Sequence, residues 1–150
     1  MASTISSSDL IVSINEQINL NGNPIDSNNS LTIASINEVD KRIVTIPFAS
    51  EVTVLNFAVA VAAGTYIIGN VKYIRITNKD DTNFVRIRVT KATAETFDIK
   101  LEAGKSFMMG NTSESVSATA AAFSAFVDMT SINAQADTAN VDCEVFIAST

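Results

Sequence analysis

The side chains that could perform chemistry in this sequence are carboxylates, because the chain contains no histidine. Asp80, Asp81, Asp98 and Glu102 are close in sequence, and two suitably placed carboxylates can support acid–base or glycosidase chemistry. Asp80 and Asp81 fall in a polar stretch of the kind that forms turns. Asp98 is expected to share a strand face with Lys100. Structural roles therefore account for these four carboxylates better than catalysis does.

Other reactive chemistry is poorly represented. Without histidine the chain lacks the commonest general base and transition-metal ligand. Its one cysteine, Cys143, can form neither an intrachain disulfide nor a Cys/His zinc site. The five glycines are too widely spaced for a phosphate-binding loop. A calcium site at Asp80, Asp81 and Asn83 would lack further ligands and a closing glutamate. We expect no catalytic residue, metal or cofactor, and no enzymatic activity.

Length and composition indicate a packed domain. The chain has 150 residues, of which 47% are hydrophobic and 17% charged, and this composition is typical of a globule. The longest apolar run, at residues 57–63, is far shorter than the roughly 20 residues of a membrane helix. The first ten residues do not resemble a secretory signal. We expect a soluble protein with no membrane partner, in which a flexible N-terminal arm (residues 1–9) precedes one domain (residues 10–150).

Strand-like alternation dominates the sequence. Val85, Ile87 and Val89 alternate with polar residues, and Ile74 and Ile76 do the same in the preceding segment. The turn-forming residues 78–83 lie between these segments, which predicts a hairpin.

Similar alternation predicts buried side chains in four further segments. Phe97, Ile99 and Leu101 form one set, and Val141, Cys143, Val145 and Ile147 form another at the C-terminus. Leu10, Val12 and Ile14, then Leu31 and Ile33, alternate near the N-terminus, and Asn21-Gly22-Asn23-Pro24 marks a turn between them.

The pattern of many short strands predicts an all-β fold, an antiparallel β-sandwich or a jelly-roll-like fold. Pro47 is expected at the end of a strand or on an edge strand, because proline cannot donate a ladder hydrogen bond. The alanine-rich segment 115–127 is compatible with a short helix or an extended arm. Cys143 is expected to be a buried, unreactive thiol.

Basic residues gather in one part of an otherwise acidic chain. The formal net charge is −6, yet residues 71–90 hold five of the ten basic side chains. On the predicted hairpin, one face would carry the candidate interface residues, Tyr73, Arg75, Phe84, Arg86 and Arg88. Such a composition is enriched at protein interfaces, although the same face could simply be solvated, with the arginines paired to Asp98 and Glu102. An acidic chain offers few phosphate contacts, so nucleic acid is not the expected partner.

Several turns in the second half of the sequence resemble those of a known class of protein. Ile76-Thr77-Asn78, the stretch Leu101–Ser106 and Ile132-Asn133-Ala134 resemble turn and strand steps in small β-sandwich structural proteins of tailed bacteriophage virions. The resemblance covers roughly residues 66–150.

The resemblance implies a non-enzymatic virion protein, made in the host cytoplasm and placed on the capsid exterior. The implied role is a decoration or cement protein that binds the major capsid protein and copies of itself, often as a trimer. A tail-associated or head-fibre binding module is the alternative. In the decoration role, an N-terminal arm would order on docking.

Overall fold

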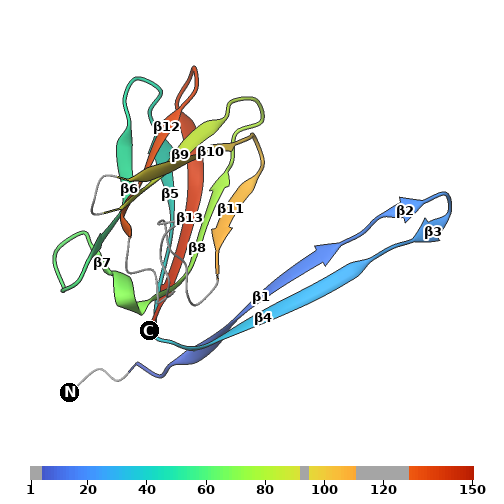
Figure 1. Ribbon diagram of the computed structural model, residues 1–150, viewed down its shortest axis with the longest axis horizontal. Coiled ribbons are helices and arrows are strands. Elements are labelled where there is room, and N and C mark those ends of the chain that lie inside the picture. The colour runs from blue at the N-terminus through green and yellow to red at the C-terminus, as the bar shows by residue number, and fades with distance from the viewer. Residues whose placement is uncertain (1–4, 92–94, 111–128) are drawn as a thin grey trace. The chain divides into compact units, whose positions relative to one another are not determined.

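The computed structural model describes residues 5–91, 95–110 and 129–150, and these residues form almost only β-strands (Figure 1). The single helical element among them is the short 3-10 turn η1 (Ile68–Asn70). The all-β prediction is confirmed. The alanine-rich segment 115–127, predicted as helix or arm, lies outside the described residues.

The chain divides into two compact units, with the boundary after Glu38. The first, which we call the hairpin unit, covers described residues 5–38. The second, the sandwich unit, is Val39–Ser149. This division differs from the predicted one, which placed residues 10–150 in a single domain. The physical reason is that alternating apolar residues look alike in a two-stranded hairpin and in a sandwich strand.

The hairpin unit is one long antiparallel ribbon. β1 (Ser8–Glu16) pairs with β4 (Ser27–Ile36), and β2 (Asn19–Leu20) pairs with β3 (Asn23–Pro24). The connection at the end of the ribbon is the two-residue turn Asn21-Gly22, and both residues have positive φ, 53° and 84°. Asn-Gly is the preferred pair for this turn because both residues tolerate left-handed backbone. The turn expected at residues 21–24 is therefore confirmed.

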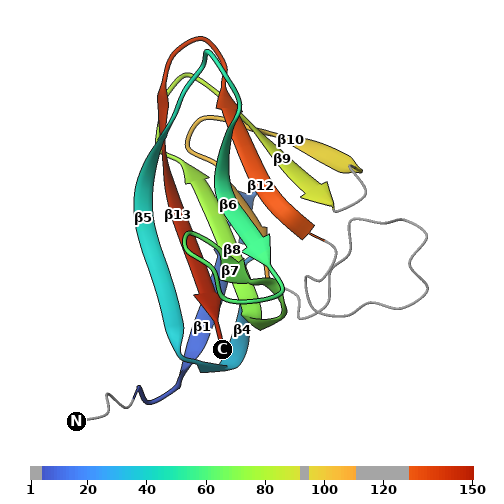
Figure 2. The ribbon, with the colours of Figure 1, turned by 90° about the vertical axis from the view of Figure 1, so that its left-hand side faces the viewer.

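The sandwich unit contains a five-stranded and a four-stranded sheet. The five-stranded sheet has the order β10-β9-β12-β6-β7, and the four-stranded sheet has the order β11-β8-β13-β5 (Figures 1 and 2). The strands of the first are β6 (Val52–Ala58), β7 (Tyr66–Ile67), β9 (Val85–Lys91), β10 (Thr96–Leu101) and β12 (Met129–Ala136). Those of the second are β5 (Glu38–Ile46), β8 (Val71–Asn78), β11 (Ser106–Met109) and β13 (Val141–Ser149). β5, which ends just before Pro47, is an edge strand, as predicted.

The core lies between the two sheets. Val85, Ile87 and Val89 of β9 are completely buried, and Ile74 and Ile76 of β8 belong to the same cluster. All four residues predicted to be buried in the last strand, Val141, Cys143, Val145 and Ile147, are buried. Phe97 departs from the prediction: it is the second residue of the edge strand β10 and remains 37% exposed. Ile99 is partly buried and Leu101 is buried, as alternation along β10 requires.

The predicted hairpin between β8 and β9 is wrong. These strands alternate as expected, but they belong to opposite sheets, so residues 79–84 cross from one layer of the sandwich to the other. Periodicity fixes which side chains of each strand point inward, and it does not reveal the hydrogen-bonding neighbour. β9 pairs instead with β10 and β12, and β8 pairs with β11 and β13.

Asn78 fixes this crossing. Its side chain is fully buried, and its Nδ2 donates hydrogen bonds to the carbonyl oxygens of Asn83 (2.8 Å) and Leu101 (3.2 Å). The Asn78 Oδ1 accepts a hydrogen bond from the backbone N–H of Asp80 (2.9 Å). One amide thus connects the end of β8, the crossing segment and the end of β10. A buried amide is tolerated here because its polar atoms find partners.

Candidate functional site

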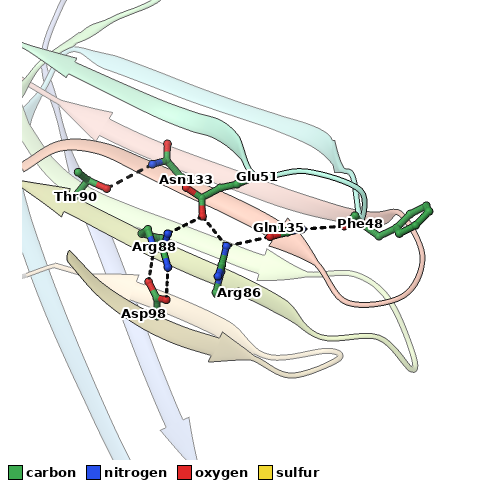
Figure 3. Close-up of polar contacts among 8 residues, drawn as sticks. All are labelled: Phe48, Glu51, Arg86, Arg88, Thr90, Asp98, Asn133 and Gln135. Carbon is green, nitrogen blue, oxygen red and sulfur yellow. Dashed lines mark hydrogen bonds and ion pairs between the residues drawn. The ribbon is translucent and has the colours of Figure 1, made fainter. Parts of the chain in front are cut away.

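The outer face of the five-stranded sheet carries two rows of polar side chains across three strands (Figure 3). In one row Asp98 of β10, Arg88 of β9 and Asn133 of β12 are direct neighbours. In the next row Arg86 is flanked by Lys100 and Gln135. Opposite charges on directly opposed residues stabilise an antiparallel pair. The rows place Arg88 opposite the carboxylate of Asp98, whereas Arg86 lies opposite Lys100 and has its acceptors in Gln135 and Glu51.

Glu51, just before β6, joins the two arginines. Its Oε2 lies 2.6 Å from Arg86 Nη2 and 3.2 Å from Arg88 Nη1. Arg88 also binds Asp98 in two-pronged fashion, through Nε to Oδ1 at 2.7 Å and Nη2 to Oδ2 at 2.8 Å. Two arginines and two carboxylates therefore form a network with no net charge. Planar guanidinium groups suit such bidentate contacts.

The network shifts the titration of its members. The hydrogen bond from Arg88 is the main reason why the pKa of Asp98 lies below its ordinary value, and the positive charge of Arg88 adds to it. The pKa of Arg88 is raised in turn, chiefly by its hydrogen bond to Asp98. Roughly a third of each of these side chains remains exposed, so solvent screens the pair strongly. The arrangement orders the face more than it stabilises the fold.

Two amides extend the network. Gln135 accepts a hydrogen bond from Arg86 Nη2 (3.0 Å) and donates one from Nε2 to the carbonyl oxygen of Phe48 (3.0 Å). Asn133 Nδ2 donates to Thr90 Oγ1 at 3.4 Å, while its Oδ1 is buried without a hydrogen-bond partner in the described structure. These contacts link β9, β12 and the segment that leads into β6.

The outer face of the four-stranded sheet holds a second, smaller cluster. Arg75 forms an ion pair with Glu144 on the neighbouring strand β13, and Lys41 of β5 lies 3.4 Å from the other oxygen of Glu144. The hydrogen bond from Arg75 is the main cause of the lowered pKa of Glu144. The Arg75 guanidinium also lies over the Phe146 ring, 6.0 Å from its centre, and Tyr73 packs edge-to-face on the same ring.

The five candidate interface residues therefore do not share a face. Tyr73 and Arg75 lie on β8 and point away from the core on one side of the sandwich, whereas Arg86 and Arg88 do so on the other. Phe84 lies in the crossing segment before β9, and the Lys100 ammonium sits 4.6 Å from its ring centre. Tyr73 is also buried, and this burial raises the pKa of its hydroxyl. The single predicted face is thus corrected to two faces.

The carboxylates considered for catalysis have structural partners. Asp80 Oδ1 accepts hydrogen bonds from the backbone N–H groups of Asn83 (2.6 Å) and Thr82 (2.8 Å), and these bonds lower its pKa. Glu102 pairs with Lys100 at 2.7 Å, and Asp98 pairs with Arg88. Within the part of the chain that the structure describes, no group of three or more Cys, Asp or Glu is placed to hold a metal ion. No described helix is long and apolar enough to span a membrane.

No protein-family model matches this chain, and no curated protein and no solved structure matches it either.

Sequence reasoning found the arginines and the Asp98 pair, but it missed Glu51, Gln135 and Glu144. Glu51 lies 35 residues from Arg86, and Glu144 lies 69 residues from Arg75. The only sequence signal for these residues is that a polar or charged side chain lies at an outward-facing position of a strand, or just before a strand. That signal becomes specific only when the order of strands in each sheet is known.

Proposed function

We propose that this protein is a non-enzymatic structural protein of a tailed-bacteriophage virion, a decoration protein that binds the exterior of the major capsid shell. The observation that carries an assembly role is the hairpin unit. Five of its large apolar side chains on one face are each more than 40% exposed. Exposed apolar surface of this extent, gathered on one face, is typical of a contact site. The assignment to a virion rests on the resemblance in residues 66–150.

The charged faces of the sandwich support binding to protein rather than to a polyanion. Each arginine on the five-stranded sheet already contacts a carboxylate, so a nucleic acid would have to displace those contacts before its phosphates were neutralised. The candidate residues Tyr73, Arg75, Phe84, Arg86 and Arg88 remain our proposed interface, with Tyr73 and Arg75 on one face, Arg86 and Arg88 on the other, and Phe84 in the crossing segment.

Copy number tests the function. In purified virions, a decoration protein should be present at hundreds of copies, comparable with the major capsid protein, which serves as the internal standard on a quantitative gel. A few to a few dozen copies would instead indicate a tail or fibre module and would refute the decoration role. Absence from virions would refute the virion assignment as a whole.

Paired neutral substitutions test the two faces separately. Arg88→Gln with Asp98→Asn removes the main pair on the five-stranded sheet, and Arg75→Gln with Glu144→Gln does so on the four-stranded sheet. Each pair of changes avoids leaving a carboxylate without its arginine. A variant that folds normally but fails to enter virions identifies its face as the one that meets the shell. Normal incorporation of both variants would show that the arginine faces are only solvated.

A further inference from the structure

The tip of the hairpin unit carries the one asparagine of the chain that is followed by glycine, Asn21. A glycine in that place has no Cβ to hinder its backbone nitrogen, so this nitrogen can attack the side-chain amide carbon and close a cyclic imide. Gly22 is also free of neighbours, because a Cβ built on it would meet no heavy atom within 4 Å. Both residues are exposed, so water and hydroxide reach the reacting atoms.

The tip is held to the rest of the ribbon by few contacts. β2 and β3 pair over two residues each, and the regular ladder of β1 and β4 ends before them, at Glu16 opposite Ser27. Between the two ladders the Ile25 N–H donates to the Ile18 carbonyl oxygen at 2.8 Å, and the Ile18 N–H donates to Asp26 Oδ1 at 3.2 Å. A two-stranded ribbon is marginally stable in water, and fraying ends open most easily in a folded protein. The tip therefore opens without unfolding of the sandwich unit.

The closed turn keeps the reacting atoms apart. Asn21 has a φ of 53°, and in this left-handed region ψ is about +47°. At that ψ the backbone bond to the Gly22 nitrogen points nearly opposite to the Cα–Cβ bond of Asn21, so the nitrogen cannot reach the side-chain amide carbon. Attack requires ψ of Asn21 to rotate, and this rotation breaks the two-residue turn. The ring can therefore close only in an opened tip.

We propose that Asn21 is a site of spontaneous deamidation whose rate is set by opening of the hairpin tip. In the opened tip the Gly22 nitrogen bonds to Asn21 Cγ and loses its proton to solvent. The Cγ–Nδ2 bond breaks, and the amide leaves as ammonia after taking up a proton. Water then adds to either carbonyl of the cyclic imide, which gives aspartate or isoaspartate. Water is the co-reactant, and nothing is oxidised or reduced.

The isoaspartate product cannot rebuild the same turn. Its backbone runs through Cβ and is longer by a carbon, whereas a two-residue turn needs the φ and ψ angles of ordinary residues. Loss of the turn releases the pair that closes it, Leu20 opposite Asn23. Both products also add a negative charge to a chain whose formal net charge is already −6. Deamidation therefore frays the hairpin from its end, and the loss of ammonia makes the change irreversible.

Neighbouring asparagines of the hairpin unit are internal references. Asn23 precedes Pro24, whose nitrogen carries no hydrogen, so no cyclic imide forms there by this route. Asn28 and Asn29 lie within β4, and each is followed by a residue with a side chain. Isoaspartate should therefore accumulate at residue 21 first. The variant Asn21→Gln would have to close a larger ring, and it should give no product at that position over the same period.

Peptide mapping by mass spectrometry measures the rate in the full chain, incubated in buffer and, in parallel, in guanidinium chloride at the same pH. The denatured sample gives the rate of the open state. In buffer the rate at Asn21 should be lower by between about threefold and about a thousandfold, which corresponds to an opening free energy of roughly 0.7–4 kcal/mol. Equal rates would show that the closed turn does not protect Asn21. A rate lower by more than about a thousandfold would mean global unfolding, and either result would overturn the inference.

A matched pair of variants at Asp26 tests the gating by the tip. Asp26→Ala removes the acceptor of the Ile18 N–H and should speed deamidation of Asn21 in buffer by about two- to tenfold, the effect of one lost hydrogen bond. Asp26→Asn keeps an oxygen acceptor at that position and should react as the wild type does. In guanidinium chloride all three chains should react alike. Equal rates of Asp26→Ala and wild type in buffer, or a faster Asp26→Ala in denaturant as well, would contradict gating by the tip. The reaction needs no virion, so these results and the copy number in virions stand or fall separately.

Discussion

Replacing Asn78 with alanine should destabilise the sandwich unit far more than its small change in volume suggests. The Asn78 side chain is fully buried and makes three hydrogen bonds, two to the carbonyl oxygens of Asn83 and Leu101 and one from the N–H of Asp80. Truncation removes all three hydrogen bonds, and the buried Leu101 carbonyl oxygen loses the bond that Asn78 Nδ2 donates to it. The segment that crosses between the sheets loses its anchor at the same time.

The magnitude follows from these contacts. Each hydrogen bond contributes a net ~1 kcal/mol, and a buried group left without a partner costs about 1–3 kcal/mol. We expect Asn78→Ala to lower the free energy of unfolding by about 3 kcal/mol, a large part of the roughly 5–15 kcal/mol typical of a domain. For a chain of this size the melting temperature should fall by about 6–12 °C.

Urea denaturation followed by circular dichroism measures the loss. The matched control is Asn56→Ala, since Asn56 is exposed on β6, and a surface change of this kind stays within about 0.5 kcal/mol. Both variants should keep the wild-type slope of free energy against urea. A loss below about 1 kcal/mol for Asn78→Ala, or one equal to the control, would refute the anchoring role and indicate that water replaces the amide.

Asn78→Asp sharpens the test, because it keeps the shape and removes both donors. The new carboxylate would face two carbonyl oxygens in a buried position, which raises its pKa in the folded state above the unfolded value of about 3.9. The folded variant then binds a proton more tightly than the unfolded chain does. Its stability relative to the wild type should therefore recover as the pH falls from 7 toward about 4. A deficit independent of pH would contradict this reasoning.

Three further predictions concern other parts of the chain. Burial raises the pKa of the Cys143 thiol to about 12, so this thiol should resist a thiol reagent until the chain unfolds. The contribution of the thiol to stability should be full below the unfolded thiol pKa and should disappear as the pH rises through about 12. Because the hydrogen bond from Arg88 lowers the pKa of Asp98, this carboxylate should stabilise the fold above its unfolded pKa and lose that effect in acid. Asp98→Asn should therefore flatten the acid limb of a plot of stability against pH. An unchanged acid limb would contradict a stabilising Arg88–Asp98 ion pair. Gly22→Ala should weaken hydrogen-exchange protection of the hairpin unit and leave that of the sandwich unit unchanged. Gly22 has a φ of 84° with open space around it, and an alanine in this left-handed conformation costs roughly 1–2 kcal/mol. Equal loss of protection in both units would show that they unfold together.

The sequence predicted the elements well where a strand has one buried and one exposed face. Alternation placed Val141, Cys143, Val145 and Ile147 in the core, and the structure confirms all four. Asn21-Gly22-Asn23-Pro24 predicted a turn, and Asn21 and Gly22 adopt the left-handed backbone of a two-residue hairpin turn. These features are local, because a period of two and a preference for positive φ depend on a few adjacent residues.

The candidate site was predicted less completely. The sequence named Arg86, Arg88 and Asp98, which do meet, but it placed Arg75 on the same face and missed Glu51. Arg88 and Asp98 are ten residues apart on paired strands, so local pattern could find them. Glu51 reaches Arg86 from before β6, on the far side of β12 in the strand order, and no local pattern contains that order.

What the sequence alone determined is therefore the inward phase of the sandwich strands β8, β9 and β13, the turn at residues 21–24, and the buried thiol. Only the tertiary structure decided which sheet each strand joined. The six residues 79–84 connect β8 and β9 across the core, and the alternation of those strands would be the same if they paired side by side. The physical reason is that hydrophobic burial selects a face of a strand, whereas its neighbour is chosen by backbone hydrogen bonds that every residue can make equally.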